Sequence, residues 1–168
     1  MKGYSNSMTD IILLIHNVRS THNVGALLRT CDGFGVRRVI ISGYSPYPKL
    51  EYDERLPHLY ERQTKQIEKT SLGAEKYLDI EHSTAPPLQS LKDNGYKIVG
   101  LEQSPSSTLL QNYTVPSKVA LLLGEEVYGI DKSLQSECDD IIEIKMSGHK
   151  ESFNVSVAAG IALYQLTI

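Results

Sequence analysis

Short apolar runs alternate along the chain with longer segments whose apolar residues recur at helical spacing. Each run is bounded by polar residues and is too short for a helix, so the runs predict buried strands; they cover residues 11–15, 39–41, 97–101, 118–123 and 141–144. Helical patterns with their start and stop signals fall between and after them, over residues 23–34, 85–94, 131–138 and 152–168. This alternation predicts an α/β fold with a mostly parallel sheet and helices on both faces.

The first helix follows the first strand closely and has clear boundaries. Asn23 is a suitable N-cap and Gly35 a suitable stop. Between them lies an apolar stripe at helical spacing, formed by Leu27, Leu28, Cys31 and Phe34. Because strand 39–41 comes next, the unit is β–α–β, and its two strands are expected to be parallel.

Residues 43–70 contain three prolines and little hydrophobic periodicity. A segment of this length without regular structure is uncommon inside a compact domain, and it is usually functional or partly helical. We therefore expect a long excursion from the sheet that has a functional role or some helix.

Polar residues follow several of the predicted strands at the point where each strand ends. They are Asn17, Arg19 and Asn23 after the first strand, Glu102 after strand 97–101, and residues 124–126 and 146–154 after the last two strands. Open α/β sheets bind ligands beyond the carboxyl ends of their strands, so these residues predict a ligand site. Neither G-x-x-x-x-G-K-[ST] nor G-x-G-x-x-G occurs, which argues against a P-loop or a dinucleotide fingerprint.

Composition predicts one globular domain, and we expect a single domain over residues 1–168 with no appended one. The chain has 168 residues, of which 40% are hydrophobic and 22% charged, as in ordinary globular proteins. The longest aliphatic run, residues 11–15, is too short for a membrane span. Cys31 and Cys138 stand apart and the five histidines are scattered, so we expect no disulfide framework, no metal site and a cytoplasmic location.

The net charge of −3 conceals an asymmetry between the two halves of the chain. Residues 1–76 carry 11 Lys and Arg against 8 Asp and Glu, whereas residues 77–168 carry 6 against 12. The excess of positive charge predicts a phosphate-contacting patch in the first half. The alternative is a solvated face, because acidic residues are interspersed there.

Three stretches, taken together, resemble motifs of one known family. They are Asn23–Thr30 (NVGALLRT), Leu123–Gly129 (LGEEVYG) and Ile144–Ile161, which contains SFNVS. In this order and spacing they resemble the SpoU branch of the SPOUT RNA methyltransferases, the TrmH-like ribose 2′-O-methyltransferases. The resemblance extends from Ile11 to Leu166, and residues 69–76 (KTSLGAEK) also look like members of this branch.

The resemblance implies a fold that the hydrophobic pattern alone does not predict. Members have a SPOUT-type fold in which the C-terminal segment forms a trefoil knot, against the general rule that chains are not knotted, and the knotted loops bind S-adenosyl-L-methionine. The members are typically homodimers that complete the catalytic pocket across the interface. The candidate contact here is the apolar face of the last helix, with Val155, Ala158, Ala159, Ile161, Ala162 and Leu166.

The resemblance also assigns residues. Arg29 matches the family's catalytic arginine, and Asn23 and Asn154 match catalytic-site asparagines. The implied cofactor-binding residues are Leu101, Glu102, Leu123, Gly124, Glu126, Ile144, Met146, Ser152 and Asn154. Two positions depart from the family pattern, since Lys145 stands where proline is usual and Phe153 where leucine is usual.

The implied reaction transfers a methyl group from a sulfonium to a ribose 2′-hydroxyl of tRNA or rRNA. Because arginine is effectively always protonated, we expect Arg29 to hold an RNA phosphate or to stabilise the developing alkoxide. Candidate RNA contacts are Arg19, Arg55, Arg62, Lys65 and Lys69. Two alternatives remain open: a catalytically silent RNA-binding dimer on the same fold, and an unknotted α/β protein that binds a small nucleotide.

Overall fold

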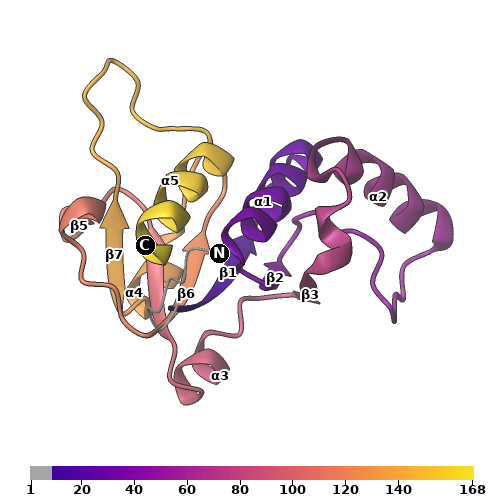
Figure 1. Ribbon diagram of the computed structural model, residues 1–168, viewed down its shortest axis with the longest axis horizontal. Coiled ribbons are helices and arrows are strands. Elements are labelled where there is room, and N and C mark those ends of the chain that lie inside the picture. The colour runs from indigo at the N-terminus through magenta and orange to yellow at the C-terminus, as the bar shows by residue number, and fades with distance from the viewer. Residues whose placement is uncertain (1–8) are drawn as a thin grey trace, which may run out of the picture.

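The computed structural model describes residues 9–168 as one sheet with helices on both faces (Figure 1). The strands are β1 (Asp10–His16), β2 (Arg38–Ser42), β3 (Asp79–Ser83), β4 (Lys97–Leu101), β5 (Thr108–Leu109), β6 (Lys118–Leu123) and β7 (Asp140–Glu143). They lie in the order β3-β2-β1-β6-β4-β7-β5, and every pairing between neighbours is parallel. The predicted α/β class and parallel sheet are confirmed.

Within residues 9–168, five helices accompany the sheet: α1 (Thr21–Phe34), α2 (Pro57–Ser71), α3 (Leu88–Asp93), α4 (Lys132–Glu137) and α5 (Val155–Thr167). Short 3₁₀ turns cover Ala74–Tyr77 and Leu110–Asn112. On one face of the sheet, α1 and α5 pack on the odd-numbered side chains of β1, and Ile67 of α2 joins the same core. On the other face, α3 and α4 pack on the even-numbered ones, Ile12 and Leu14.

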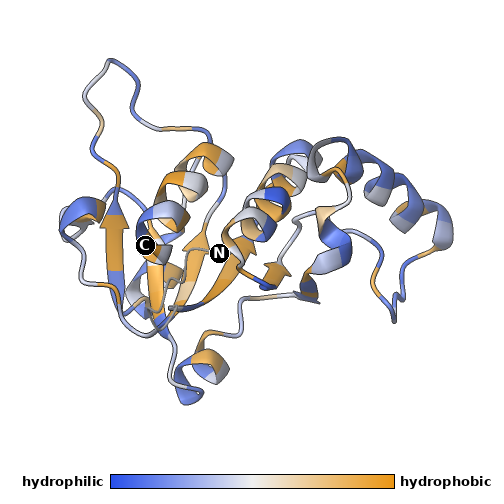
Figure 2. Cartoon of the chain, in the orientation of Figure 1, coloured by the Kyte–Doolittle hydropathy of each residue, from blue (hydrophilic) through white to orange (hydrophobic). Residues whose placement is uncertain are grey.

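The strands are apolar because both sides of the central sheet are covered. All five residues from Ile11 to Ile15 are buried, as are the five from Val119 to Leu123, so neither strand shows the polar–apolar alternation of a sheet with one wet face. Figure 2 shows the apolar colour concentrated on these strands and on the helix sides that face them. This central pair β1–β6 fixes the positions of the loops that follow each strand.

Helix α1 begins earlier than the sequence pattern indicated. Its N-cap is Ser20, whose side chain accepts a hydrogen bond from the Asn23 backbone N–H, so the prediction of Asn23 as the N-cap is wrong. Ser20 and Asn23 are both good capping residues, and the pattern favoured the one nearer the apolar stripe. The correction frees the Asn23 side chain for other contacts. The predicted stop at Gly35 is confirmed, with φ of 73°.

The excursion after β2 contains one long helix, and an edge strand follows it. Helix α2 follows Leu56, and β3 pairs with β2. Partial helix was expected here, whereas β3 was not predicted, because its sequence DIEHS has only one aliphatic residue. It is defined by its pairing with β2 rather than by a buried apolar run.

Helix α5 divides its apolar residues between two faces. Ala159, Ala162 and Leu166 are at most 1% exposed, in the core of the same chain, so their assignment to a face available to a partner is wrong. The other side carries exposed apolar residues at helical spacing, and Phe153 and Ile168 flank them just outside the two ends of the helix. We call this set the α5 stripe: Phe153, Val157, Ile161, Tyr164 and Ile168.

Candidate functional site

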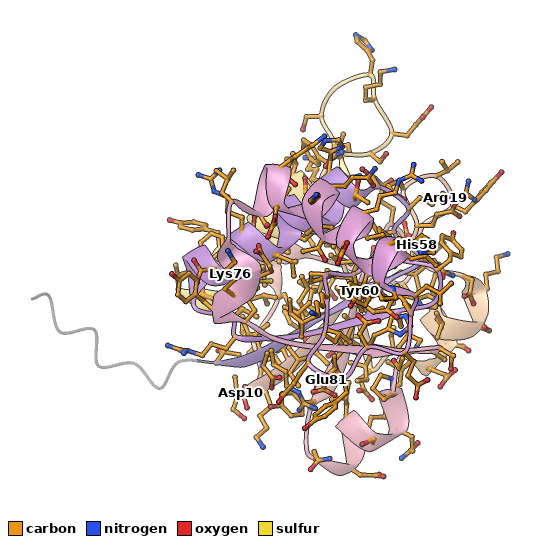
Figure 3. All side chains as sticks on the ribbon, turned by 90° about the vertical axis from the view of Figure 1, so that its right-hand side faces the viewer. Asp10, Arg19, His58, Tyr60, Lys76 and Glu81 are labelled. Carbon is orange, nitrogen blue, oxygen red and sulfur yellow. The ribbon has the colours of Figure 1, made fainter. Side chains whose placement is uncertain are left out.

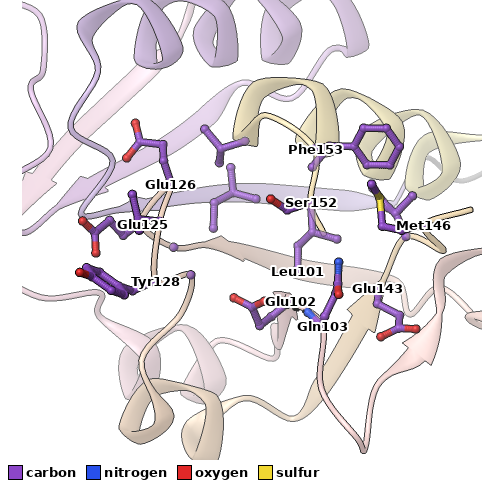
Figure 4. Close-up of a pocket in the computed structure, with 17 residues that line it drawn as sticks. Leu101, Glu102, Gln103, Glu125, Glu126, Tyr128, Glu143, Met146, Ser152 and Phe153 are labelled. Carbon is purple, nitrogen blue, oxygen red and sulfur yellow. Dashed lines mark hydrogen bonds between the residues drawn. The ribbon is translucent and has the colours of Figure 1, made fainter. Parts of the chain in front are cut away.

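A cavity opens at the carboxyl ends of β4, β6 and β7, where the sequence predicted a ligand site (Figure 4). The start of α5 closes one side of it, and the turn after β6 closes another. Its volume is about 200 Å³, and it is partly open to solvent. Segments that are far apart in the sequence therefore meet at the carboxyl ends of the strands and line one pocket.

Most of the residues that the family resemblance assigned to the cofactor line this cavity. They are Leu101, Glu102, Leu123, Gly124, Glu126, Ile144, Met146 and Ser152. Asn154 is not among the lining residues, because it is the N-cap of α5 and its Oδ1 accepts from the Ser156 backbone N–H. The structure thus brings eight of the nine assigned residues together around the cavity, and the ninth, Asn154, lies at the start of α5 next to them.

The turn after β6 is a tight loop that requires glycine at two of its positions. The Glu125 and Gly129 backbones exchange two hydrogen bonds of 3.0 and 2.9 Å. A Cβ on Gly124 would lie 2.3 Å from the Gly129 carbonyl carbon, and Gly129 has φ of 68°. Glu102 supports the end of the turn by accepting from the Ile130 N–H at 2.9 Å. These contacts explain why glycines occupy both positions.

A continuous chain of hydrogen bonds connects the three motifs. The Glu126 carboxylate accepts from the Asn23 Nδ2 at 3.1 Å and from the backbone N–H groups of Arg19 and Ser20 at 3.1 and 3.2 Å. Asn23 in turn accepts at its Oδ1 from Asn154 Nδ2 at 3.2 Å. We call this set, Glu126–Asn23–Asn154, the motif chain. It fixes how both amides are oriented, because each oxygen and each nitrogen has a defined partner.

The carboxyl group of Glu126 has a pKa below its ordinary value. Partial burial opposes its ionisation, but the hydrogen bonds from the backbone N–H groups and from Asn23 together outweigh burial. Glu126 is therefore an ionised acceptor at neutral pH, which is the state that the motif chain requires.

Carboxylates dominate the polar lining of the cavity. Glu102, Glu125, Glu126 and Glu143 all line it, and the lining contains no Lys, Arg or His. Figure 4 shows these side chains around the opening together with Tyr128 and Met146. Apolar walls are supplied by Leu101, Leu123 and Ile144. Such a site favours a ligand that combines an apolar part with positive charge.

The proposed catalytic arginine does not reach this cavity within one chain. Arg29 lies on α1 and is exposed, and it is not among the residues that line the cavity. Arg19 lies nearer, since its Nη2 is 2.8 Å from the Glu125 carboxylate and its guanidinium is 5.6 Å from the Tyr44 ring centroid. Arg19 therefore stands at the edge of the site and Arg29 apart from it.

The candidate RNA contacts divide into two groups. Arg55 is occupied inside its own loop: its guanidinium lies 3.5 Å from the Tyr47 ring centroid and donates to the Asp53 carboxylate and to three other acceptors. These contacts give Arg55 a structural role. Arg62, Lys65 and Lys69 are exposed and, at spacings of three and four residues, share the outer side of α2. Figure 3 looks onto this end of the molecule, with His58 and Tyr60 of α2 labelled.

Several lining residues were not assigned from the sequence. Glu125, Val127, Tyr128 and Gly129 belong to the second motif, so membership in that motif was a signal that could have identified them. Ala158 lies within the third motif, so the same signal covered it. Gln103 and Glu143 lie outside the motifs, and only the fold brings these two positions to the cavity.

Two further observations concern metal ligands and membrane-spanning helices. Within residues 9–168, no group of three or more His, Cys, Asp or Glu side chains is arranged to hold a metal ion. In the same part of the chain, no helix has the length and apolar character needed to cross a bilayer.

Comparison with known proteins identifies relatives over nearly the whole chain. The model of the SpoU rRNA Methylase family matches residues 10–164. Putative TrmH family tRNA/rRNA methyltransferases from Staphylococcus saprophyticus and Staphylococcus aureus are 34% and 32% identical over 157 residues. These matches cover 92% of this chain and 57% of each relative, so the chain spans little more than half the length of these relatives.

Solved structures share the fold. The A. aeolicus TrmH/SpoU tRNA modifying enzyme is 29% identical with a TM-score of 0.77, and the match covers 94% of this chain and 74% of that one. The SpoU methyltransferase AviRb from Streptomyces viridochromogenes, in complex with the cofactor AdoMet, is 21% identical with a TM-score of 0.75, covering 95% and 57%. The sheet is thus a SPOUT-type fold, and the chain belongs to the SpoU methylase family, the TrmH-like branch of the SPOUT methyltransferases.

Proposed function

We propose that this protein is a methyltransferase that uses S-adenosyl-L-methionine to methylate a ribose 2′-hydroxyl of tRNA or rRNA in the cytoplasm. The observation that carries the proposal is the convergence of the three motifs: two line one cavity, and the motif chain links all three. Relatives named as tRNA/rRNA methyltransferases support the RNA substrate. The proposal includes a trefoil knot formed by the C-terminal segment, as the family resemblance implies.

The residues of the cavity fit this cofactor. Its adenosyl part suits the apolar walls formed by Leu101, Leu123 and Ile144, and the backbone groups at these strand ends provide hydrogen-bonding partners. S-adenosyl-L-methionine carries a sulfonium and an ammonium against one carboxylate, so its net positive charge suits a lining with carboxylates and no basic side chain. When bound, the cofactor supplies an activated methyl group, and the protein has to bind and orient the ribose hydroxyl.

Within this proposal, Ser152 and Asn154 shape the entrance for the ribose, and Asn23 and Glu126 hold the Asn154 amide in one orientation. Arg29 is proposed to hold an RNA phosphate or to stabilise the forming alkoxide. Because Arg29 does not line the cavity of its own chain, we propose that it acts at the cavity of a second copy.

The proposed homodimer has a candidate interface in the α5 stripe. Val157 is 50% exposed, Tyr164 57% and Ile168 71%. Exposed apolar residues arranged in a stripe mark interaction surfaces more often than singly scattered ones do. Phe153 belongs both to this stripe and to the cavity lining, so a partner on the stripe would lie beside the active site.

A first experiment tests the cofactor before any RNA is chosen. Calorimetric titration with S-adenosyl-L-methionine is expected to show saturable binding to the wild type. Methylation of bulk tRNA and rRNA with radiolabelled cofactor then tests the transfer, and nuclease digestion locates the label on the ribose or on the base. Label on a base, or absence of cofactor binding by folded protein, would refute the proposed function.

A second candidate is a catalytically silent RNA-binding dimer, favoured by the distance of Arg29 from its own cavity. Arg29→Ala distinguishes the two. If the protein is the enzyme, the variant is expected to keep its cofactor affinity and lose most methyl transfer. A wild type that binds RNA and cofactor but transfers no methyl to any RNA would favour the silent dimer.

A further inference from the structure

The loop between β7 and α5 begins and ends at the cavity but extends away from it between those points. Met146 and Ser152 both line the cavity, whereas residues 147–150 are exposed. Figure 1 shows the loop rising above the end of the sheet, and Figure 3 shows the same loop standing clear of the body from a second direction. We call residues 145–151 the β7–α5 arm.

The β7–α5 arm carries lysines that form no ion pair with any of the described residues 9–168. Elsewhere in the acidic half, the Lys92 and Lys97 ammonium groups lie 3.7 and 3.8 Å from the carboxylates of Asp139 and Asp140. Among residues 9–168, no carboxylate lies within ion-pair distance of Lys145 or Lys150.

Both of these lysines are exposed, and the exposed His149 lies next to Lys150. Counted with the exposed carboxylate of Glu151, the arm carries a net charge of +1, in the half of the chain that has 12 acidic residues against 6 basic ones.

The base of the arm is held while its tip is open. The Gln103 side-chain amide donates to the Glu151 carbonyl at 2.5 Å. This hydrogen bond fixes the end of the arm that leads into α5. At the tip, a Cβ on Gly148 would meet no atom within 4 Å. The cations of the arm are not among the residues that line the cavity. Their positions thus favour a ligand outside the cavity over the cofactor within it.

We infer that the β7–α5 arm binds backbone phosphates of the RNA on either side of the nucleotide presented to the cavity. This inference rests on the proposed function. The tip, Gly148, lies two residues from Met146 and four from Ser152, which both line the cavity, so its backbone reaches at most about 7 Å from the cavity wall, within a few nucleotides of the target. Lysine ammonium groups are suited to phosphate as point charges.

Charge explains why such an arm is needed. The carboxylates of the cavity lining, which suit a cationic cofactor, repel the phosphates of an RNA strand that approaches it. The protein as a whole is also negative, at −3. Local cations next to the cavity offset this repulsion where the strand has to lie.

The test measures RNA affinity against salt for Lys145→Ala, Lys150→Ala and the double variant. The probe is end-labelled bulk tRNA, read by fluorescence anisotropy, with a parallel titration of S-adenosyl-L-methionine. Lys132→Ala is the matched control, since Lys132 is exposed at the start of α4, on the other face of the sheet, and its substitution removes the same charge.

Each arm variant is expected to flatten the slope of log K against log salt by about 0.7 to 0.9, and the double variant by about 1.4 to 1.8, which weakens binding about tenfold or more near 0.1 M salt. Cofactor affinity is expected to stay unchanged. Equal effects of Lys132→Ala, or weakened cofactor binding with unchanged RNA binding, would overturn the inference.

The outcome is separable from that of the proposed function. If the wild type binds neither cofactor nor tRNA, the proposed function fails, and the inference that rests on it is overturned with it. If the wild type binds both and the arm variants keep the wild-type salt slope, only the role of the arm is refuted.

Discussion

Two glycines of α1 occupy opposite surroundings. A Cβ on Gly25 would lie 2.3 Å from the Ile67 carbonyl oxygen and 2.1 Å from the Thr70 hydroxyl, both on α2. A Cβ on Gly33 would meet nothing within 4 Å. Gly25 thus allows α1 and α2 to approach closely, whereas Gly33 has no such role. Substituting alanine at each position therefore separates the effect of helix packing on stability from the effect of helix propensity.

We predict that Gly25→Ala lowers the free energy of unfolding by about 1–3 kcal/mol, because the α2 backbone must shift to accept the methyl group. Gly33→Ala is the control and is expected to leave stability unchanged or raise it by up to about 1 kcal/mol. Urea denaturation of both variants measures the difference. Equal stabilities would show that the α1–α2 contact is loose.

The motif chain gives stability a dependence on pH. The folded-state pKa of Glu126 is below its ordinary value. The stability that the ionised carboxylate contributes is therefore present above the unfolded-state pKa of about 4.3, and it is lost as the pH falls through the lower folded-state pKa. We predict that Glu126→Gln is less stable than the wild type at pH 7 by roughly 1 kcal/mol.

Denaturation curves between pH 3 and 7 measure this gap, which is expected to close towards the acid end. Glu61→Gln, at an exposed position of α2, is expected to show no such gap. A constant difference at every pH would mean that the ionised state of Glu126 is unimportant.

At the scale of elements, α5 has one face in the core and one exposed apolar stripe. We predict that Val157→Glu abolishes dimer formation, because the new charge would be desolvated at the interface. Leu59→Glu is the matched control on α2, where the leucine is 45% exposed, and this variant is expected to remain dimeric. Light scattering coupled to size-exclusion chromatography measures the mass. A dimeric Val157→Glu protein would place the interface elsewhere.

Helix α2 presents Arg62, Lys65 and Lys69 along its outer side. We predict that the double variant Arg62→Glu/Lys65→Glu binds bulk tRNA more weakly and with a flatter salt dependence, because phosphate contacts release counterions. Cofactor affinity is expected to be unchanged, since α2 contributes nothing to the cavity lining. If the double variant binds RNA as tightly as the wild type, these residues are a solvated face that does not contact RNA.

Elements with a strong hydrophobic pattern could be predicted from the sequence. Elements that depend on contacts with the rest of the fold could not. The buried strands β1 and β6 and the stripe of α1 show directly in the sequence. Helix α2 buries only Ile67 and Ser71, so its apolar signal is weak, and β3 is an edge strand whose residues are intermediate or exposed.

For the site, the motifs identified Gly124 and Glu126. Glu143 and Gln103 could not be found, because their positions depend on how β4 and β7 pair.

At the scale of the whole molecule, the cavity joins the second half of the sheet to α5, and Asn23 connects it to the first half. A ligand bound there stabilises the folded state, by about 2.7 kcal/mol at a concentration 100 times Kd. We predict that saturating S-adenosyl-L-methionine raises Tm by roughly 5–10 °C.

Differential scanning fluorimetry with and without the cofactor measures this shift. ATP is the control ligand: it has the same adenosyl group, but its phosphates are repelled by the carboxylate lining, and no rise is expected. An equal rise with both ligands would indicate recognition of the adenosyl group alone.

The order of the strands has a consequence for biosynthesis. The interior strand β1 leaves the ribosome early, but one of its two neighbours, β6, begins only at residue 118. The cavity also needs β7 and the start of α5. A nascent chain therefore exposes one edge of its most apolar strand through much of translation, and it gains a ligand site only near the end of synthesis. Contacts so distant in sequence favour slow folding, and an apolar strand with a free edge invites pairing with other chains. Newly synthesised chains are therefore expected to bind chaperones that recognise extended apolar segments.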